Sequence, residues 1–302
     1  MTFKEKLQTD FGQAVVLNTG DNMPIIGLGT WLAETEEVRH SVEAAVKAGY
    51  RQIDTAWIYG NEEEIGEALA KLFEEEVVKR EDLFITTKLW QDKFHQKVEE
   101  GLRESLENLG LDYVDLFLIH FPAFQHVEEE EDEEDATFSS KEFDHLKVWE
   151  QMESVYNKGL TKAIGLSNFN QVQLQNVYDN AKIKPANLQV MCNAYQPQFD
   201  LHDYCKELNI SFTAYSPLGS PGFQKMKGDN RSPVLMDDPL VAEIAKRYGK
   251  SPAQILLRWL VQRGIVVIPK SVQQNRIEKN IQIFDFYLGE EDFNAIKTLR
   301  RK

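Results

Sequence analysis

Short apolar runs alternate along the chain with longer segments in which apolar residues recur at helical spacing. A short run bounded by polar residues is typical of a buried strand, and apolar residues at i, i+4, i+7 and i+8 form one face of a helix packed on a sheet. The pattern predicts strands at residues 25–30, 50–54, 83–89, 114–120, 162–168, 187–193, 211–216 and 265–270. It predicts helical stripes at Val38, Val42, Ala45 and Val46, at Ile65, Leu69, Leu72 and Phe73, at Leu201, Tyr204, Cys205 and Leu208, and at Ile255, Trp259 and Leu260.

The order of these segments predicts an α/β fold. Strands that are joined through helices run parallel and are buried on both faces, and eight of them can close into a (β/α)8 barrel. A chain of 302 residues is an ordinary length for such a barrel, so we expect a single domain over residues 1–302. Residues 14–25 predict an N-terminal β-hairpin with a Gly-Asp-Asn turn that covers one end. Long loops follow strands 4 and 7, at residues 121–145 and 217–238.

Composition places this fold in water and in a reducing compartment. Hydrophobic residues make up 42% of the chain and charged residues 27%, which is typical of a globular protein with a large core. The N-terminus MTFKEKLQTD has charges where a signal peptide needs an apolar core, and no apolar run approaches the roughly 18 residues of a membrane helix. Cys192 and Cys205 are too few for a disulfide framework. We therefore expect a cytoplasmic protein without a membrane partner.

The charge of the chain is acidic, and part of it is local. A formal net charge of −15 argues against nucleic acid as a partner, because phosphate binding needs a basic surface. Residues 128–135 form an unbroken acidic run, within the loop after the fourth predicted strand. Blocks of like charge repel themselves, so we expect this insert to be a flexible, solvated loop.

The predicted strands share a second feature, because they run apolar and then end in residues with reactive or hydrogen-bonding groups. The active sites of (β/α)8 barrels lie at the face formed by the C-terminal ends of the strands. We therefore expect these side chains to meet at one mouth of the barrel. They are Asp54, Lys88, His120, Ser167, Asn168, Gln189, Tyr215, Ser216, Lys270 and Ser271.

This set of residues limits the chemistry. A metal-dependent hydrolase needs several His and carboxylate ligands, and only Asp54 and His120 qualify. A serine nucleophile would need an elbow such as GxSxG, which the sequence lacks. His202 and Cys205 have an HxxC spacing, but two further zinc ligands are missing, so we expect no metal. Lys88 could form a Schiff base, as in aldolases of this fold, and this alternative stays open.

Tyr59 offers a general acid, because it follows Asp54 by five residues. A lysine ammonium about 4 Å away, at an effective dielectric near 20, is worth about 4 kcal/mol, or about three pKa units. Lys88 could therefore lower the pKa of Tyr59 from about 10 toward neutrality, while Asp54 would hold the lysine and cancel part of its effect. The net shift depends on distances that the sequence does not give. His120 could then orient a carbonyl oxygen beside the tyrosine hydroxyl.

These residues lie in motifs that resemble those of the aldo-keto reductase family over nearly the whole chain. The motifs are GLGTW (27–31), IDTAWIYGNEEEIG (53–66), KLW (88–90), DLFLIHFP (115–122), GLSNF (165–169), YSPLGS (215–220) and IPKS with Arg276 (268–276). The resemblance implies a (β/α)8 barrel that reduces carbonyl compounds with NADPH. It also implies that Tyr59 donates the proton, that Lys88 and Asp54 tune it, and that His120 orients the substrate.

The resemblance further implies a cofactor site, although the chain has no GxGxxG of the Rossmann type. Ser167, Asn168 and Gln189 would hold the carboxamide, and Tyr215 would stack on the nicotinamide ring. The cations and hydroxyl of Lys270, Ser271 and Arg276 would bind the 2′-phosphate of the adenosine, which favours NADPH and leaves NADH as the alternative. Further cofactor contacts are expected from Thr30, Asp54, Ser216, Leu218, Ser220 and Asn280.

By the same resemblance, the substrate pocket would be lined by Trp31, Trp90, His120 and Phe121. The HFP triplet at 120–122 is similar to that of xylose reductases, whereas aldose reductases typically have HWP. After Gln189 the family commonly has a glutamate and a His-Pro pair, and this chain has Met191, Asn193 and Ala194 instead. The chain ends at Lys302, while relatives with narrow pockets often have a longer tail, so we expect an open pocket.

We therefore expect an NADPH-dependent reductase of aldehydes or aldoses, with ketones as further candidates, that acts on small carbonyl substrates as a monomer or weak dimer. Two alternatives remain. One is a lysine Schiff-base aldolase on the same barrel. The other is a cofactor-binding regulatory subunit with little turnover, similar to the channel-associated members of the family.

Overall fold

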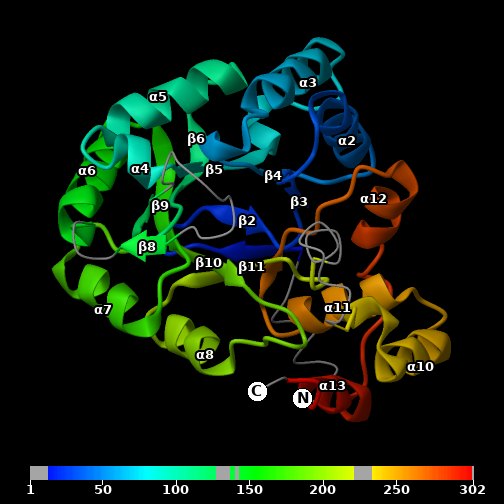
Figure 1. Cartoon of the computed structure of the whole chain (residues 1–302). Coiled ribbons are helices and arrows are strands. Elements are labelled where there is room, and N and C mark those ends of the chain that lie inside the picture. The colour runs from blue at the N-terminus through cyan, green and yellow to red at the C-terminus, as the bar shows by residue number, and fades with distance from the viewer. Residues whose placement is uncertain (1–12, 127–136, 140–142, 221–232, 301–302) are drawn as a thin grey trace.

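Eight parallel strands form the centre of the molecule, and helices surround them (Figure 1). The computed structural model describes residues 13–126, 137–139, 143–220 and 233–300. The central strands are β3 (Leu28–Gly29), β4 (Gln52–Asp54), β5 (Phe84–Leu89), β6 (Val114–Ile119), β9 (Thr161–Ser167), β10 (Asn187–Met191), β11 (Ser211–Tyr215) and β12 (Val266–Val267). All eight predicted strands are thus present.

The sheet closes on itself. Its strands follow one another in chain order from β3 to β12, and each neighbouring pair is parallel. Parallel bridges between Ile26 and Val267 and between Gly29 and Lys270 join the first strand to the last. A Cβ at Gly29 would lie 2.8 Å from the carbonyl oxygen of Ile268, so this seam needs a glycine. The prediction of a closed (β/α)8 barrel is confirmed.

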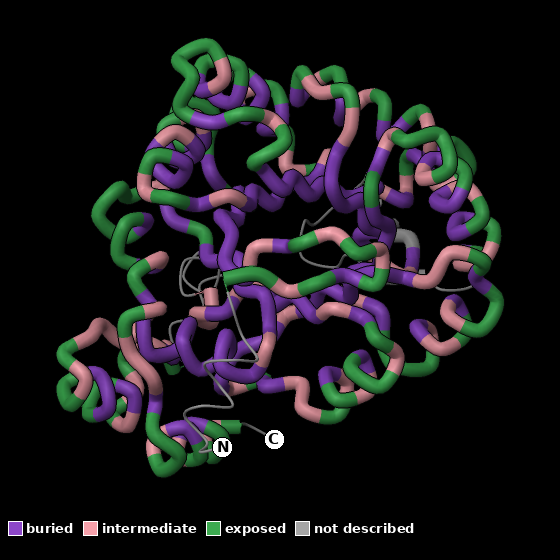
Figure 2. Tube along the Cα trace, turned by 180° about the vertical axis from the view of Figure 1, so that it is seen from behind, coloured by how far each residue is buried: buried purple, intermediate pink, exposed green. Residues whose placement is uncertain are grey.

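One helix follows each barrel strand and packs its apolar face on the sheet. Figure 2 shows buried strands inside a ring of helices whose outer faces are exposed. The barrel helices are α2 (Thr35–Lys47), α3 (Glu62–Glu74), α5 (Val98–Leu109), α6 (His145–Asn157), α7 (Gln171–Asn180), α8 (Phe199–Glu207), α11 (Pro252–Val261) and α12 (Gln274–Ile281). Additional helices are α4 (Gln91–Phe94), α10 (Pro239–Tyr248) and α13 (Glu290–Lys297), with short 3-10 helices η1 (Trp57–Tyr59), η2 (Arg80–Asp82) and η3 (Leu235–Asp237).

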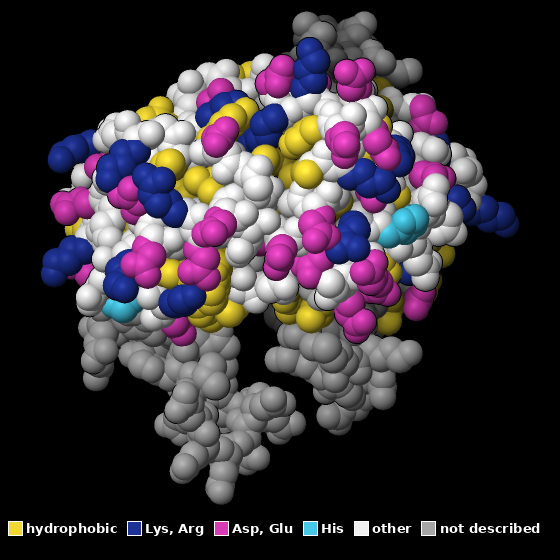
Figure 3. Space-filling model, turned by 90° about the horizontal axis from the view of Figure 1, so that it is seen from above, with side chains coloured by type: hydrophobic (Ala, Val, Ile, Leu, Met, Phe, Trp, Pro, Cys, Tyr) yellow, Lys and Arg dark blue, Asp and Glu magenta, His cyan; other side chains and the backbone are white. Residues whose placement is uncertain are grey.

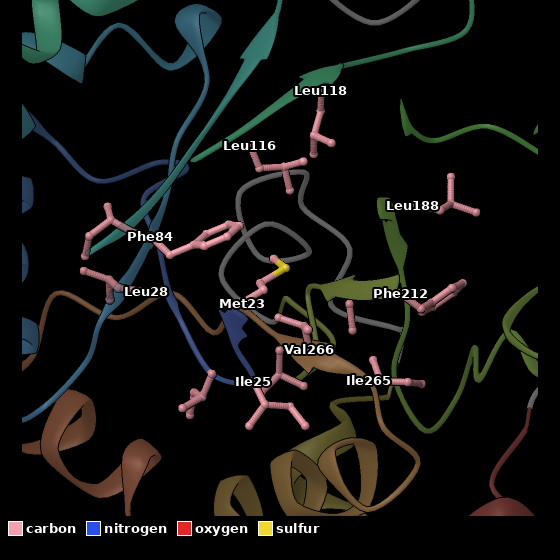
Figure 4. Close-up of a cluster of buried hydrophobic side chains, with 14 of the residues drawn as sticks. Met23, Ile25, Leu28, Phe84, Leu116, Leu118, Leu188, Phe212, Ile265 and Val266 are labelled. Atoms are coloured by element: carbon pink, nitrogen blue, oxygen red, sulfur yellow. The ribbon is translucent and has the colours of Figure 1, made fainter. Parts of the chain in front are cut away.

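The predicted N-terminal hairpin is also confirmed. Strands β1 (Ala14–Val16) and β2 (Asn22–Pro24) pair antiparallel and cross the barrel at the end where the strands begin (Figure 1). Met23 is fully buried and accepts a weak hydrogen bond from Asn187, the first residue of β10. Figure 4 shows Met23 among buried apolar side chains such as Phe84 and Phe212, which are among the first two residues of their strands. The hairpin therefore seals the N-terminal end, and the opposite end is left as the mouth.

The loop after β6 contains a small antiparallel pair, β7 (Phe124–His126) with β8 (Thr137–Ser139). The predicted acidic insert at 128–135 lies outside the described residues. The loop after β11 is described up to residue 220 and again from 233, where η3 leads into α10.

The outer surface carries charges of both signs. Figure 3 shows one side of the molecule, on which basic and acidic side chains are interspersed. Ion pairs link neighbouring helices of the barrel, such as Lys71 with Glu43 at 2.8 Å between α3 and α2. Among the described helices, none has both the length and the apolar character needed to cross a bilayer.

The contact between α3 and α5 gives a test of barrel packing at Gly66. A Cβ at this position would lie 2.5 Å from the carbonyl oxygen of Asn108 and 2.8 Å from that of Leu109, both backbone atoms. In an unobstructed helix, Gly→Ala stabilises by about 1 kcal/mol. Here we expect Gly66→Ala to destabilise the fold by about 1–3 kcal/mol, because α3 and α5 must move apart.

Urea unfolding measures this change. Ala70→Gly on the exposed face of α3 is the control, with an expected loss of about 1 kcal/mol from helix propensity alone. A Gly66→Ala protein more stable than the wild type would contradict the packing described here.

Candidate active site

A buried ion pair occupies the mouth of the barrel. Side chains alternate along a strand, so Thr87 of β5 faces the helix layer while Lys88 faces the interior. The Nζ of Lys88 lies 2.5 Å from the Oδ1 of Asp54, the last residue of β4, and both side chains are almost fully buried. The same Nζ donates to the carbonyl oxygen of Thr55 at 2.8 Å and to the Oη of Tyr59 at 3.4 Å. Three predicted catalytic residues are thus in contact.

Tyr59 is held by the turn that follows it. It ends the 3-10 helix η1, and Gly60 closes that helix with a left-handed φ of 63°. Asn61 is buried, and its Nδ2 donates to the carbonyl oxygens of Thr30 at 3.0 Å and Ala33 at 3.2 Å. This amide ties the Tyr59 turn to the loop after β3.

Glu62 fastens the same turn to β5. Its buried carboxyl accepts a hydrogen bond of 2.5 Å from the Oγ1 of Thr87, the residue before Lys88. Burial raises the pKa of Glu62, and the bond from Thr87 opposes that rise. Sequence reasoning missed both Asn61 and Glu62 as site residues, although they lie in the motif at 53–66, because nothing in the sequence shows which groups they bind.

Burial and charge compete in setting the protonation of the pair. Burial would lower the pKa of Lys88, but the Asp54 carboxylate and Tyr59 raise it above its ordinary value, so the amine is charged. Burial raises the pKa of Tyr59, Lys88 opposes the rise, and Asp54 adds to it. The net direction is upward, so in this structure burial outweighs the lowering of the Tyr59 pKa by Lys88. The phenol is protonated at neutral pH, which is the state a proton donor needs.

His120 completes the group at the end of β6. Its ring lies edge-on to Tyr59, with 5.7 Å between centroids, and to Trp90 at 5.8 Å, and it stacks on Phe121 at 4.8 Å. Burial holds the pKa of His120 well below its ordinary value, and the nearby Lys88 adds to the effect. The imidazole is therefore neutral and has one N–H to donate.

A second group of predicted residues adjoins the first. The Nε2 of Gln189 donates to the Oδ2 of Asp54 at 2.7 Å. Asn168 donates from its Nδ2 to the carbonyl oxygen of His120 at 3.0 Å, and its Oδ1 accepts from the Oη of Tyr215 at 2.8 Å. Ser167 is buried beside Asn168 and accepts a hydrogen bond from it at 3.2 Å. Hydroxyl and amide groups thus line one side of the mouth.

A third group lies near the start of α12. Lys270 is exposed and donates from its Nζ to the carbonyl oxygen of Leu32 at 2.8 Å, across the seam of the barrel. Arg276 is exposed in the first turn of α12, while Ser271 and Asn280 are buried nearby in the chain.

The remaining predicted residues lie on the loops around the mouth. Thr30 donates from its Oγ1 to the carbonyl oxygen of Asp54 at 3.0 Å. Ser220 donates to Ser216 at 2.5 Å, and Leu218 packs partly buried on the core. Trp31 is 38% exposed on the loop after β3.

Comparison with known proteins agrees with this geometry. The model of the "Aldo/keto reductase family" matches residues 25–301. The chain belongs to this family. It is 45% identical over 294 residues to chicken (Gallus gallus) aldo-keto reductase family 1 member A1, and the match covers 95% of this chain and 88% of the relative. It is 44% identical over 291 residues to the human (Homo sapiens) protein of that name, with 95% of this chain and 89% of that relative covered. The solved structure of the aldose reductase from Schistosoma japonicum is similar to it with a TM-score of 0.86 and 40% identity, covering 96% of this chain and 94% of that one.

As an aldo/keto reductase, the protein is an oxidoreductase of small carbonyl compounds, and members of the family typically use NADPH. The charge on Lys88 agrees with this assignment, because a Schiff base needs a neutral amine and this amine is an ammonium bonded to Asp54.

The HxxC pair of α8 forms no metal site with its described neighbours. His202 packs its ring on Phe212 with 5.2 Å between centroids, and Cys205 is buried with a free thiol. No group of three or more potential ligands occurs in the described part of the chain.

The Lys88–Asp54 pair predicts a strong coupling in unfolding experiments. Lys88→Met alone leaves a buried carboxylate without its cation, so we expect a loss of about 3–5 kcal/mol in the free energy of unfolding. Adding Asp54→Asn removes the stranded charge, so the double variant should be more stable than Lys88→Met alone.

Urea unfolding of the two single variants and the double variant measures the coupling. The half-exposed pair Lys93–Glu104, at 3.1 Å, is the control and should show little coupling. Additive losses at Lys88 and Asp54 would show that the two groups do not depend on each other.

Proposed function

We propose that this aldo/keto reductase reduces an aldehyde or an aldose to the alcohol with NADPH, and that Tyr59 donates the proton. One observation carries the proposal. The protonated phenol of Tyr59 lies 3.4 Å from the charged Nζ of Lys88, and the ring of a neutral His120 lies edge-on to it with 5.7 Å between centroids. Carbonyl reduction uses a proton donor and a cation that stabilises the conjugate base of that donor. It also uses a second hydrogen-bond donor to the carbonyl oxygen.

The residues present fit a dinucleotide phosphate in their chemistry. Ser167, Asn168 and Gln189 offer hydroxyl and amide groups to a carboxamide, and the ring of Tyr215 borders them. Lys270 and Arg276 offer exposed cations to the 2′-phosphate, with Ser271 beside them. Thr30, Ser216, Leu218, Ser220 and Asn280 complete the proposed contacts. The 2′-phosphate assignment favours NADPH over NADH.

The mechanism follows from the donors around the mouth. The carbonyl oxygen of the substrate lies between the Oη of Tyr59 and the N–H of His120 in this proposal. NADPH, when bound, supplies the hydride that reaches the carbonyl carbon. As the electron pair of the double bond moves to oxygen, Tyr59 transfers its proton there and becomes a tyrosinate. Lys88 stabilises that anion, and Asp54 keeps the lysine in place.

The walls of the proposed substrate pocket are aromatic. Trp90 lies edge-on to Phe121 with 6.2 Å between centroids, next to His120, and Trp31 is exposed at the rim. Such a surface suits the carbon skeleton of an aldehyde. The monomeric or weakly dimeric state and the cytoplasmic location stay predictions. The competing regulatory subunit is disfavoured because Asp54, Tyr59 and Lys88 are in bonding contact.

Replacement of the proton donor tests the mechanism. We expect Tyr59→Phe to reduce NADPH-dependent turnover by at least about 100-fold, because proton donation by a positioned acid is worth about 10²–10⁴. Its affinity for NADPH should stay near that of the wild type, since the hydroxyl is assigned to the substrate. NADPH oxidation is measured with a panel of aldoses, simple aldehydes and ketones.

Tyr204→Phe on α8 is the matched control and should leave turnover unchanged. A Tyr59→Phe protein with near-normal rates on every substrate would defeat the mechanism.

Replacement of Lys270 tests the cofactor assignment. Lys270→Ala should weaken NADPH binding by about tenfold or more, because a charge-assisted hydrogen bond to a phosphate is lost, and should change NADH binding little. Cofactor affinities are measured by quenching of tryptophan fluorescence. The exposed Lys246 of α10 provides the control variant Lys246→Ala. Equal losses for both cofactors would refute the 2′-phosphate assignment.

A further inference from the structure

Gln189 contacts the charged centre of the mouth directly. It is the third residue of β10 and is 1% exposed inside the barrel. Its Nε2 lies 2.7 Å from the Oδ2 of Asp54, while the Nζ of Lys88 lies 2.5 Å from the Oδ1. Each carboxylate oxygen of Asp54 therefore has one strong donor. One donor comes from β5, the neighbour of β4, and the other from β10, across the barrel.

The charge of Asp54 fixes which way the amide of Gln189 points. A carboxylate paired with an ammonium can only accept hydrogen bonds, so the NH2 group of Gln189 must face it. The Oε1 is then the other end of the amide. Within the described part of the chain, the side-chain hydrogen bond of Gln189 runs to Asp54 alone.

The backbone of Gln189 supports the other half of the site. Its carbonyl oxygen accepts a hydrogen bond of 3.0 Å from the backbone N–H of Asn168, which has a left-handed φ of 64°. Asn168 in turn donates from its Nδ2 to the carbonyl oxygen of His120 at 3.0 Å. Gln189 thus contacts Asp54 through its side chain, and it is connected with His120 through its backbone and Asn168.

We propose that Gln189 is a positioning residue for proton transfer, which holds Asp54 so that Lys88 stays between Asp54 and Tyr59. A carboxylate held only by Lys88 could rotate and draw the ammonium away from the phenol. The Oε1 of Gln189 is left to accept a hydrogen bond from the carboxamide of the cofactor, and this part rests on the proposed function. Cofactor binding and the proton donor are then coupled through a single side-chain amide.

A residue that only binds cofactor would behave differently. Its loss would weaken cofactor affinity, turnover would recover at saturating cofactor, and the cofactor-free protein would be unchanged around Tyr59. Loss of a positioning residue affects Tyr59 in the absence of cofactor and lowers turnover at saturating cofactor.

The variants Gln189→Leu and Gln189→Glu separate these cases, and Asn187→Leu is the matched control. Asn187 is also a buried amide of β10, but it bonds to Ser211 and Thr213 near the sealed end.

The first measurement uses protein without cofactor, labelled with a carbon isotope at the tyrosine Cζ. We expect Gln189→Leu to shift the Tyr59 resonance, assigned by its loss in Tyr59→Phe, while Asn187→Leu leaves it in place. At saturating NADPH, Gln189→Leu should lose about 10- to 100-fold in turnover, the usual range for a hydrogen bond to a charged group.

The second measurement is the pH profile of Gln189→Glu, which is nearly isosteric and guards against misfolding of the leucine variant. When protonated, the introduced carboxyl donates to Asp54 as the amide does. When ionised, it places a second negative charge beside Asp54, and the two cannot both be held there. Activity is therefore present below the pKa of the introduced carboxyl group and falls about tenfold or more above it. The pH profile of the wild type should lack this fall. The titratable groups that face this position are Asp54, Tyr59, Lys88, His120 and Tyr215.

The proposal is overturned if the Tyr59 resonance is unshifted in Gln189→Leu. It is also overturned if the activity of Gln189→Glu does not fall above the pKa of the introduced carboxyl group. Failure of the proposed function would appear separately, as a wild-type protein without NADPH-dependent turnover. In that case the cofactor-free resonance still decides whether Gln189 positions Asp54.

Discussion

The site depends on the placement of one charged pair, Lys88 with Asp54, whose side chains are almost fully buried at the mouth of the barrel. Burying two charges is costly unless each keeps its partners. Lys88 donates to Asp54, to the carbonyl oxygen of Thr55 and to Tyr59, and both oxygens of Asp54 accept a bond. The ion pair is therefore stable only in one arrangement, and that arrangement places an ammonium beside the phenol of Tyr59.

The barrel makes this arrangement possible. The strands β4 and β5 are neighbours, with Asp54, the last residue of β4, in register with Thr86. Lys88 lies two residues further along β5, and its side chain reaches the carboxylate of Asp54. The hairpin seals the other end with Met23, and the apolar residues below the mouth exclude water (Figure 4). Lys88 is buried and Tyr59 is half-buried, which strengthens the interaction between them. The same burial raises the pKa of the phenol. The same burial thus keeps Tyr59 protonated and makes the cation effective.

Much of the fold could be predicted from hydrophobic periodicity, because burial in a barrel imposes strong patterns. The eight strands and the hairpin were found within a few residues, as at 211–216 against Ser211–Tyr215. The first strand was predicted at 25–30 and is shorter, Leu28–Gly29, because its start joins β12 only through isolated bridges. The convergence of Asp54, Lys88 and His120 followed from their place at strand ends. The direction of the Tyr59 pKa shift could not be predicted, because it depends on burial and on distances that the sequence does not show. The bonds of Asn61, Glu62 and Gln189 join residues far apart in sequence, so no local pattern could indicate them.

The protonation of Tyr59 is the most direct test of this account. The tyrosines are labelled at Cζ with a carbon isotope, and the Tyr59 resonance of the cofactor-free protein is followed as the pH is raised. The account predicts a phenol that remains protonated through neutral pH, with a pKa above the ordinary value of tyrosine, because burial outweighs the effect of Lys88. A resonance of the ionised tyrosinate at neutral pH would contradict it.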